Sequence, residues 1–325
     1  MAKAEIPTLY FSGEALSSGS ESRRELCNRV RKACESHGCF LLMYDHGNIP
    51  AKLRQNLFVS MKALFDLPED TKTKYVNPKP YRSYTGRSPV IPFYESFGLD
   101  DAHKLGQVQD FTNLMWPQGN TSFCEILHVM SSKMLEMNLM VLKMIFESFG
   151  MEKHYDSHIQ DSTSLFKVMK YIAPPSNGRG SGEDSAIALR AHRDKNAITI
   201  LCQNEVQGLE VESKDGEWAR VMVPQDAFVV IVGEALKVIN AKLSQLVWSN
   251  GRLEAARHRV VINGKEDRYS CALFSMPKEE SKIEVPCELV DKDHPLLYRP
   301  FIFSDYISYF VSKLSDDALE IYAGI

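Results

Sequence analysis

The stretch AIALRAHRDKNAITILCQNEVQGLEVES, at residues 186–213, consists of short apolar runs interrupted by polar and turn-forming residues. Within the runs, apolar residues favour a period of two, which is the period of a β-strand. A similar run, SLFKVMKYIA, precedes this stretch, and AFVVIVG, HRVVIN and RYSCALFSM follow it. Many short strands separated by turn signals are typical of a β-sandwich or barrel rather than an α/β sheet. The chain is therefore predicted to be mainly β.

Helices and a further strand are predicted before this region. Residues 23–36 carry apolar side chains at helical spacing and end against Gly38, and residues 39–46 (CFLLMYDH) form a buried strand. Residues 52–67 form a second helix that stops before a proline. Residues 77–119 are broken by Pro, Gly and aromatic residues and are too irregular for a regular element. They are predicted to form a loop over the active site.

A long helix is predicted at residues 126–150, opened by a capping box at Ser122 and Glu125 and closed by Gly150. Its methionines are assigned to the core, because Met fills irregular gaps. The segment FIFSDYISYFVSKL near the C-terminus is predicted to be helical. We expect an N-terminal mixed region with the covering loop at 1–120, and the support helix, strand-rich core and final helix at 121–325, acting as one catalytic unit.

Composition points to a small-molecule partner. A net charge of -4 over 325 residues gives no sign of nucleic acid or an anionic membrane surface as a partner. No apolar run has the length needed to cross a bilayer. The seven cysteines are odd in number and form no CxxC pair, which suits reduced thiols. We expect a soluble, cytoplasmic and monomeric protein.

Two histidines and an aspartate form a candidate metal site. His192 and Asp194 lie two residues apart at the end of a predicted strand, so both side chains would point to one face. His258, in HRVVIN, offers a third ligand from distant sequence. Two imidazoles and one carboxylate on one face of an octahedron leave three positions open, as a ferrous oxygenase requires. HxD alone is a weak signal, because a chance occurrence is unsurprising among nine histidines.

Arg268 strengthens this interpretation. It follows His258 along the chain, and strand alternation puts its guanidinium on one face with the hydroxyl of Ser270, where the two could bind a carboxylate. Tyr171, in KVMKYIAPP, could donate its hydroxyl to the same carboxylate. The alternatives are a structural ion pair or solvated strand end for Arg268 and an ordinary sheet tyrosine for Tyr171.

The succession HRD, HRV and RYS resembles the plant 2-oxoglutarate- and Fe(II)-dependent dioxygenase superfamily, and the resemblance spans nearly the whole chain. IPTLYFSGEAL, ACESHGCFLL, ALFDLPEDTK, VWSNGRL and HPLLYRPF are all similar to that family. KYIAPP and FTNLMWP are most similar to its AOP-like subgroup, which includes glucosinolate side-chain oxygenases, auxin-oxidising dioxygenases and lignan-forming deoxypodophyllotoxin synthase. The resemblance implies a double-stranded β-helix (jelly-roll) core flanked by helices, with iron at one mouth of the barrel.

The resemblance also implies the chemistry. His192, Asp194 and His258 would hold Fe(II), while Arg268 and Ser270, helped by Tyr171, would hold the far carboxylate of 2-oxoglutarate. Oxygen would be the oxidant and ascorbate an accessory reductant. The reaction would release succinate and CO2 and oxidise a small molecule by hydroxylation, demethylation, desaturation or ring closure.

Three departures from the family pattern stand out. Arg193 stands where many relatives have Thr, and it should point away from the metal. Met169 stands where many have Asn, which removes a polar contact. Residues 237–246 are an extra segment between Gly233-Glu234 and the WSNG turn. If that segment distorted the neighbouring strand, His258 would be misplaced and activity would fall.

Aromatic residues are candidates for the substrate pocket, although each could equally pack in the core: Tyr84, Phe93, Tyr94, Phe97, Trp116, Phe274, Phe303 and Tyr306. Together they suggest an apolar or aromatic specialised metabolite or hormone. The remaining histidines are assigned surface or hydrogen-bonded core positions: His37, His46, His103, His128, His154, His158 and His294.

Three rival functions remain open. A few relatives use the same triad as oxidases without 2-oxoglutarate, and succinate formation separates these from the dioxygenases. A catalytically weak relative would bind ligand without turnover, as the extra segment suggests. A cupin-like isomerase or storage barrel would need additional metal-binding histidines, which the sequence does not offer.

Overall fold

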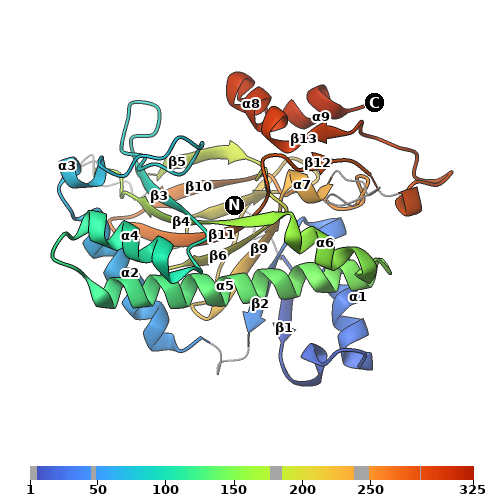
Figure 1. Cartoon of the computed structure of the whole chain (residues 1–325), viewed down its shortest axis with the longest axis horizontal. Helices are drawn as coiled ribbons and strands as arrows, with labels where there is room; N and C mark the ends of the chain where they lie inside the picture. The colour runs from blue at the N-terminus through green and yellow to red at the C-terminus, as the bar shows by residue number, and fades with distance from the viewer. Residues whose placement is uncertain (1–5, 45–48, 176–184, 238–248, 286) are drawn as a thin grey trace.

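The computed structural model describes residues 6–44, 49–175, 185–237, 249–285 and 287–325. Two β-sheets form its centre (Figure 1). The larger has seven strands in the order β1 (Thr8–Phe11), β2 (Cys39–Tyr44), β9 (Ala227–Val232), β6 (Ile198–Gln203), β11 (Arg268–Pro277), β4 (Ser162–Tyr171) and β3 (Tyr94–Asp100). The smaller has four, in the order β5 (Ser185–His192), β10 (His258–Asn263), β7 (Leu209–Glu212) and β8 (Trp218–Arg220). β12 (Lys282–Ile283) and β13 (Phe301–Ile302) pair separately.

All neighbouring strands run antiparallel except β1 and β2, which are parallel. Two antiparallel sheets built from distant segments are the jelly-roll arrangement, and the prediction of a mainly β fold with that core is confirmed. The strands predicted between residues 162 and 277 are all present.

The described residues form the helices α1 (Glu21–Ser36), α2 (Ala51–Phe65), α3 (Glu69–Lys72), α4 (Leu105–Met115), α5 (Thr121–Ser148), α6 (Tyr155–Gln160), α7 (Glu234–Lys237), α8 (Phe303–Lys313) and α9 (Ala318–Ala323). Of these, α1, α2, α4, α5 and α6 contact strands of the larger sheet. The long helix α5 contacts α1, α2, α4, β6 and β11. In Figure 1, α8 and α9 lie at the top, and the strands lie between them and α5. No helix among the described residues is both long and apolar enough to span a membrane.

Strand alternation divides the interior into two cores. On β11, Tyr269, Cys271 and Leu273 face the helices, where the methionines of α5 are also buried as predicted. Ala272, between them, faces the other way and belongs to the core enclosed by the two sheets. We call these the helix-side core and the inner core. The inner core is the space in which a jelly roll holds a ligand.

Two predictions about secondary structure were wrong. Residues 77–119, predicted to be an irregular loop, contain β3 and α4. The strand was obscured because its outward-facing Glu95 is buried in an ion pair with Lys72, 2.7 Å away, instead of marking a solvent face. The capping box was also wrong, because Asn120 caps α5 by accepting the backbone N–H of Phe123 at 3.1 Å.

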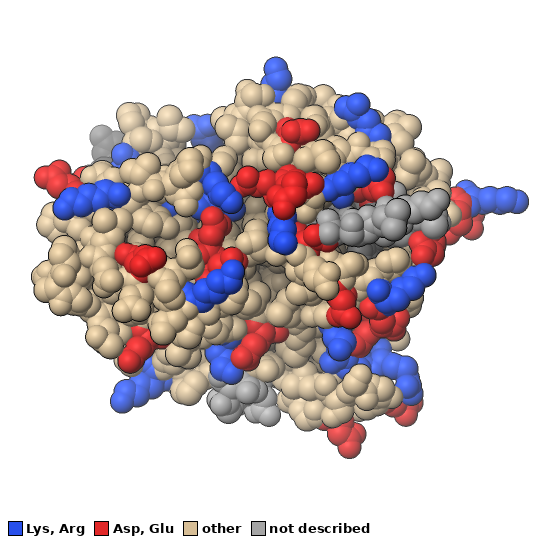
Figure 2. Space-filling model, viewed as in Figure 1, with Lys and Arg blue, Asp and Glu red and all other residues tan. Residues whose placement is uncertain are grey.

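Acidic and basic side chains are interspersed on the face shown in Figure 2. This mixture is consistent with a net charge of only -4.

Candidate active site

The three predicted metal ligands come together at the edge of the inner core. His192 is the last residue of β5 and lies opposite His258, the first residue of β10, in the antiparallel register. Asp194 follows β5 by two residues. The three ligand atoms lie within 4.8 Å of one another. Strand pairing therefore brings together residues that are far apart in sequence.

Each histidine has one ring nitrogen occupied. His192 Nδ1 lies 2.9 Å from the carbonyl oxygen of Arg190, and His258 Nδ1 lies 3.0 Å from that of Ala256. A carbonyl only accepts, so Nδ1 must carry the proton as donor and Nε2 presents its lone pair. Hydrogen bonds of this kind fix the tautomer and orientation of metal-binding histidines.

Asp194 has one free oxygen facing both imidazoles. Its Oδ1 lies 3.6 Å from His192 Nε2 and 3.8 Å from His258 Nε2. Its Oδ2 accepts a hydrogen bond from the Thr199 hydroxyl at 2.5 Å. Ligand atoms bound at right angles to one metal ion by bonds of ~2.1 Å lie ~3 Å apart. A small inward movement would therefore close the triad on an ion.

Burial and charge favour the metal-binding protonation states. Burial, together with the neighbouring charge of His192 when protonated, lowers the pKa of His258 to about 4. The His258 imidazole is therefore neutral near pH 7. Burial alone would raise the pKa of Asp194, but the neighbouring imidazoles and the Thr199 hydroxyl bring it below its usual value. A neutral, oriented pair of imidazoles and an ionised carboxylate suit ferrous iron.

The triad opens on one side. The His192 side chain is 32% exposed, whereas those of Asp194 and His258 are 7% and 8% exposed. A metal bound here would be reached past His192.

The loop that carries Asp194 is supported from α8. The backbone N–H of Glu234 donates to the carbonyl of Asp194 at 2.7 Å. The buried Glu234 carboxylate accepts hydrogen bonds from Lys195 at 2.6 Å and from the hydroxyl of Tyr306. Tyr306, predicted to line the substrate pocket, is instead buried in the helix-side core and bound to this carboxylate.

Arg268 lies in the inner core and is completely buried. Its guanidinium donates to Gln203 Oε1 at 2.9 Å and to Ser270 Oγ at 3.3 Å, while its Nε has no hydrogen-bond partner. Among the residues that the structure describes, no carboxylate forms an ion pair with it. Buried arginines are normally paired, so this guanidinium is prepared for an acidic ligand. Gln203 was missed because a glutamine ending a strand carries no signal of its own.

Tyr171 lies beside Arg268. The two are direct partners in the β4–β11 register, and the guanidinium carbon lies 4.8 Å from the ring centroid. Burial raises the pKa of Tyr171 to about 12, so the hydroxyl keeps its proton and can donate it. It lies 3.4 Å from the sulfur of Met169, a weak acceptor, and is therefore available for a stronger one.

Three aromatic residues predicted to line the substrate pocket face the helix-side core instead. Phe97 is buried in the helix-side core with Tyr84, whose hydroxyl donates to Glu95. Trp116 packs against Phe123 in the same core, with ring centroids 4.6 Å apart and the rings tilted by 49°. Phe97 lies on the outward-facing side of β3, and the alternation of that strand determines its direction.

The other predicted aromatics are divided. Tyr94 is part of the inner core, Phe93 packs against it, and Phe274 contacts both cores. Phe303 is buried in the helix-side core. The structure therefore brings Phe93, Tyr94 and Phe274, but not Phe303, to the inner side.

Lys167 was missed by sequence reasoning. It lies on the inner face of β4 with Met169 and Tyr171, and its ammonium lies 3.3 Å from the Tyr94 hydroxyl. A charged residue in an alternating strand normally predicts the solvent face, which is why the pattern concealed it.

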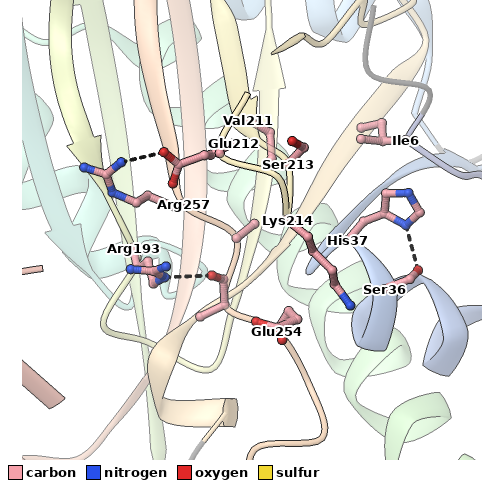
Figure 3. Close-up of a pocket in the computed structure, with 13 residues that line it drawn as sticks. Ile6, Ser36, His37, Arg193, Val211, Glu212, Ser213, Lys214, Glu254 and Arg257 are labelled. Carbon is pink, nitrogen blue, oxygen red and sulfur yellow. Dashed lines mark hydrogen bonds and ion pairs between the residues drawn. The ribbon is translucent and has the colours of Figure 1, made fainter. Parts of the chain in front are cut away.

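A surface cleft of about 720 Å³ lies beside the segment that leads into His258 (Figure 3). Arg193 points into this cleft and donates to the carbonyl of Ala255 at 3.1 Å. The sequence-based expectation that Arg193 points away from the metal ligands agrees with this position. Arg257 and Glu212, on another wall, pair with each other at 2.9 Å.

The histidines outside the triad are mostly hydrogen-bonded or paired with carboxylates, as predicted, at His37, His103, His128, His154 and His294. His158 is an exception: it is buried, and neither ring nitrogen has a hydrogen-bond partner. His46 lies outside the described residues.

The extra segment does not displace His258. Of residues 237–246, only Lys237, at the end of α7, is described. Next to the segment, the Ser249 hydroxyl donates to the carbonyl of Leu236 at 3.0 Å. His258 begins a strand paired on both sides, with β5 and β7.

Known proteins are similar to this chain in sequence and fold. Residues 153–277 match the 2OG-Fe(II) oxygenase superfamily, and residues 6–117 match the N-terminal region described as non-haem dioxygenase in morphine synthesis. The chain is 39% identical over 323 residues to a probable 2-oxoglutarate-dependent dioxygenase, AOP1, of Arabidopsis thaliana, covering 98% of this chain and 96% of that protein.

Two solved structures are similar throughout. The dioxygenase for auxin oxidation from rice superposes with a TM-score of 0.80 at 29% identity, covering 98% of this chain and 100% of that one. The 2-oxoglutarate complex of the Arabidopsis thaliana enzyme superposes with a TM-score of 0.75 at 24% identity, covering 89% and 99%, which supports the fold.

Proposed function

Because this chain belongs to the 2-oxoglutarate- and Fe(II)-dependent dioxygenases, we propose that His192, Asp194 and His258 hold its ferrous ion and that Arg268 binds its 2-oxoglutarate. The protein is an oxidoreductase with a small-molecule substrate. The assignment of individual residues rests on the geometry of the inner core.

The main support for this proposal is that the Arg268 guanidinium is buried and forms no ion pair with a carboxylate among the described residues. A guanidinium in the interior without an acid costs several kcal/mol unless a ligand supplies the opposite charge. Ser270 is already within hydrogen-bond distance of it, and the Tyr171 ring flanks it. A carboxylate entering here would receive two parallel N–H bonds and two hydroxyl donors.

The residues of the chain orient the reactants. Arg268, Ser270 and Tyr171 would fix one end of 2-oxoglutarate, so that its other end meets the triad. The iron supplies the oxidising chemistry when bound. Asp194 and the two imidazoles would fix its position, and the apolar residues of the inner core would exclude water from the reacting C–H bond.

For the organic substrate, we propose a small apolar or aromatic specialised metabolite or hormone. Tyr94, Phe93 and Phe274 offer aromatic surface on the inner side. The similarity to a rice dioxygenase for auxin oxidation supports a molecule of that size.

We further propose that the chain works as one catalytic unit and as a monomer. β1, β2 and β3, from the first 120 residues, are strands of the same sheet as β11. Light scattering on the purified protein would test the monomer, with a mass near 36.8 kDa expected.

Anaerobic visible spectroscopy tests the site. Adding Fe(II) and then 2-oxoglutarate to apoprotein should produce a weak charge-transfer band in the wild type and in Arg259→Ala, whose side chain pairs with Glu210. The band should be lost in His192→Ala, while Arg268→Ala should need far more 2-oxoglutarate to form it.

Exposure to O2 then distinguishes the rival functions. Succinate should form, and a matching metabolite should accelerate it. A folded wild-type protein without the band would contradict the proposed sites, and substrate oxidation without succinate would support the oxidase instead.

A further inference from the structure

Lys167 is directed into the space between the two sheets. On β4 it shares a face with Met169 and Tyr171, and its partners in the sheet are Gly98 on β3 and Ala272 on β11. Ala272 leaves room on one side of the lysine, whereas the segment of Tyr81 and Arg82 packs against Gly98 on the other. Part of that side chain remains accessible, so a ligand could reach it.

The Lys167 ammonium is surrounded by aromatic groups. It lies 3.3 Å from the Tyr94 hydroxyl and 5.9 Å from the centroid of the Tyr94 ring. On another side it lies 5.8 Å from the centroid of Tyr81, in the segment that crosses the inner face of β3. A Cβ on Gly98 would lie 2.4 Å from the Tyr81 carbonyl oxygen, so only glycine allows this segment to lie so close.

The Lys167 ammonium lacks the carboxylate partner that two other lysines with little exposed surface have. Lys72 pairs with Glu95 at 2.7 Å, and Lys195 pairs with Glu234 at 2.6 Å. Within the described ranges, no carboxylate lies within ion-pair distance of Lys167. Lys167 is half-buried, and a carboxylate partner would offset the cost of removing part of its charge from water.

Electrostatics connect this lysine with the metal site. Burial lowers the pKa of Lys167, whereas Tyr171 and the Asp194 carboxylate partly oppose that effect. The Asp194 carboxylate faces both histidines and forms no ion pair with Lys167 among the described residues. An anionic ligand beside Lys167 would neutralise the positive charge of its ammonium.

We propose that Lys167 and the Tyr94 hydroxyl bind a carboxylate on the organic substrate. The inference rests on the proposed function and narrows its substrate class to small carboxylic acids with an apolar or aromatic body. The carboxylate would fix one end of the molecule between Tyr81 and Tyr94. The remainder would extend along the inner core toward the triad.

The 2-oxoglutarate site does not account for Lys167. Arg268 is opposite Tyr171 in the register, whereas Lys167 is opposite Ala272. Arg268 donates to Gln203 and Ser270, whereas the Lys167 ammonium contacts the Tyr94 hydroxyl. The Tyr94 and Tyr171 rings, with centroids 5.3 Å apart, lie between the two cations, so two anions would bind next to each other with different partners.

Binding of matched acids and amides tests the proposal. The probes are phenylacetate, cinnamate and indole-3-acetate, each with its primary amide, so that only the charge changes. They are added to anaerobic Zn(II)-loaded protein saturated with 2-oxoglutarate, and affinity is measured by saturation-transfer NMR. At least one acid should bind the wild type tenfold or more tightly than its amide.

Two variants complete the test. Lys167→Met should remove the preference for the acid while leaving amide binding unchanged. Lys170→Met, on the opposite face of β4 where Lys170 pairs with Asp267 at 3.3 Å, should retain the preference. The melting temperature of Lys167→Met should equal or exceed that of the wild type, since an unpaired buried charge is lost.

Several outcomes would overturn the inference: equal binding of acids and amides, a preference that persists in Lys167→Met, or no binding of any acid at millimolar concentration. The charge-transfer band of Fe(II) and 2-oxoglutarate is recorded on the same preparations. It should be unchanged in Lys167→Met. Its absence from the wild type would instead mean that the proposed function itself has failed.

Discussion

The backbone next to each metal-binding histidine orients its imidazole, whereas the orientation of the Asp194 carboxylate depends on a side chain from a different strand. His192 and His258 each contact the carbonyl two residues earlier, so backbone geometry alone selects their tautomer. Asp194 instead needs the hydroxyl of Thr199, on β6, to hold Oδ2 and leave Oδ1 free. The position of the Asp194 carboxylate therefore depends on Thr199 more than the positions of the imidazoles depend on any single side chain.

Substituting Thr199 by Val removes the hydroxyl but keeps the shape of the side chain. We expect metal affinity to fall by about 10- to 100-fold, as for other losses of a hydrogen bond to a metal ligand. Titration with Co(II), followed by its visible absorption, measures this affinity. Thr199→Ser should recover most of it, and an unchanged affinity in Thr199→Val would show that the hydrogen bond does not position Asp194.

Substituting His158 by Leu should raise stability, most strongly in acid. Burial lowers the pKa of His158 to about 3 in the folded protein, against ~6.5 when unfolded. Between these values only the unfolded chain binds the proton, so the wild type loses up to ~1.4 kcal/mol of stability per pH unit as the pH falls below 6.5.

The difference in unfolding free energy between His158→Leu and the wild type, from urea titrations at pH 5 and 7.5, isolates this contribution. It should be larger at pH 5. A pH-independent difference would mean that the imidazole finds a partner or a proton in the folded state.

At the scale of elements, helix α8 is connected to the metal site through hydrogen bonds to Glu234. Its Tyr306 holds the Glu234 carboxylate, and the backbone of Glu234 holds the carbonyl of Asp194. Burial and the Glu234 charge raise the pKa of Tyr306 far above its usual value, so the hydroxyl remains a donor. Helix α8 is thus linked to the Asp194 loop through Glu234, and its Tyr306 does not line the pocket.

Tyr306→Phe should lower the free energy of unfolding by ~1–3 kcal/mol, because a buried carboxylate loses a donor. Co(II) affinity should fall at the same time if the contact positions Asp194. Tyr309→Phe is the matched control on the same helix, where the ring packs on Tyr322. Loss of stability without loss of Co(II) affinity would limit Tyr306 to a structural role.

The elements that sequence predicted best are those whose alternation is not disturbed by polar residues. β9 is a continuous apolar run, and β6 and β10 each have an apolar centre (ITIL and VVI), so their strands and the position of His258 followed directly. β3 carries a buried glutamate, serine and glycine, each justified only by a contact from distant sequence, and it was missed. Lys167 was missed for the same reason: no local pattern distinguishes an inward-facing lysine from a solvated one.

At the scale of the whole molecule, the two faces of the larger sheet have different roles: one contributes to stability and the other carries the candidate binding residues. Its outer face packs on helices and provides the large helix-side core, while its inner face carries Arg268, Lys167 and Thr199. Aromatic composition alone could not assign Phe97 to one face or Tyr94 to the other. The register of β3 against β4 makes that distinction.

Replacing residues 238–246 by two glycines should leave the fold and the metal site intact. The flanks of this segment are already joined by the bond from Ser249 to Leu236, and shortening a loop changes its closure entropy by only ~1 kcal/mol. We expect a melting temperature within a few degrees of the wild type and an unchanged charge-transfer band. Loss of the band in a folded variant would give the segment a role at the site.

The unneutralised guanidinium of Arg268 has a consequence for the lifetime of the protein. A ligand that binds only the folded state adds RT ln(1 + [L]/Kd) to its stability, or ~2.7 kcal/mol at a hundredfold excess over Kd. Degradation often follows the small population of opened molecules. Cellular half-life would then rise and fall with the supply of 2-oxoglutarate, and metabolic scarcity would reduce the amount of enzyme as well as its turnover.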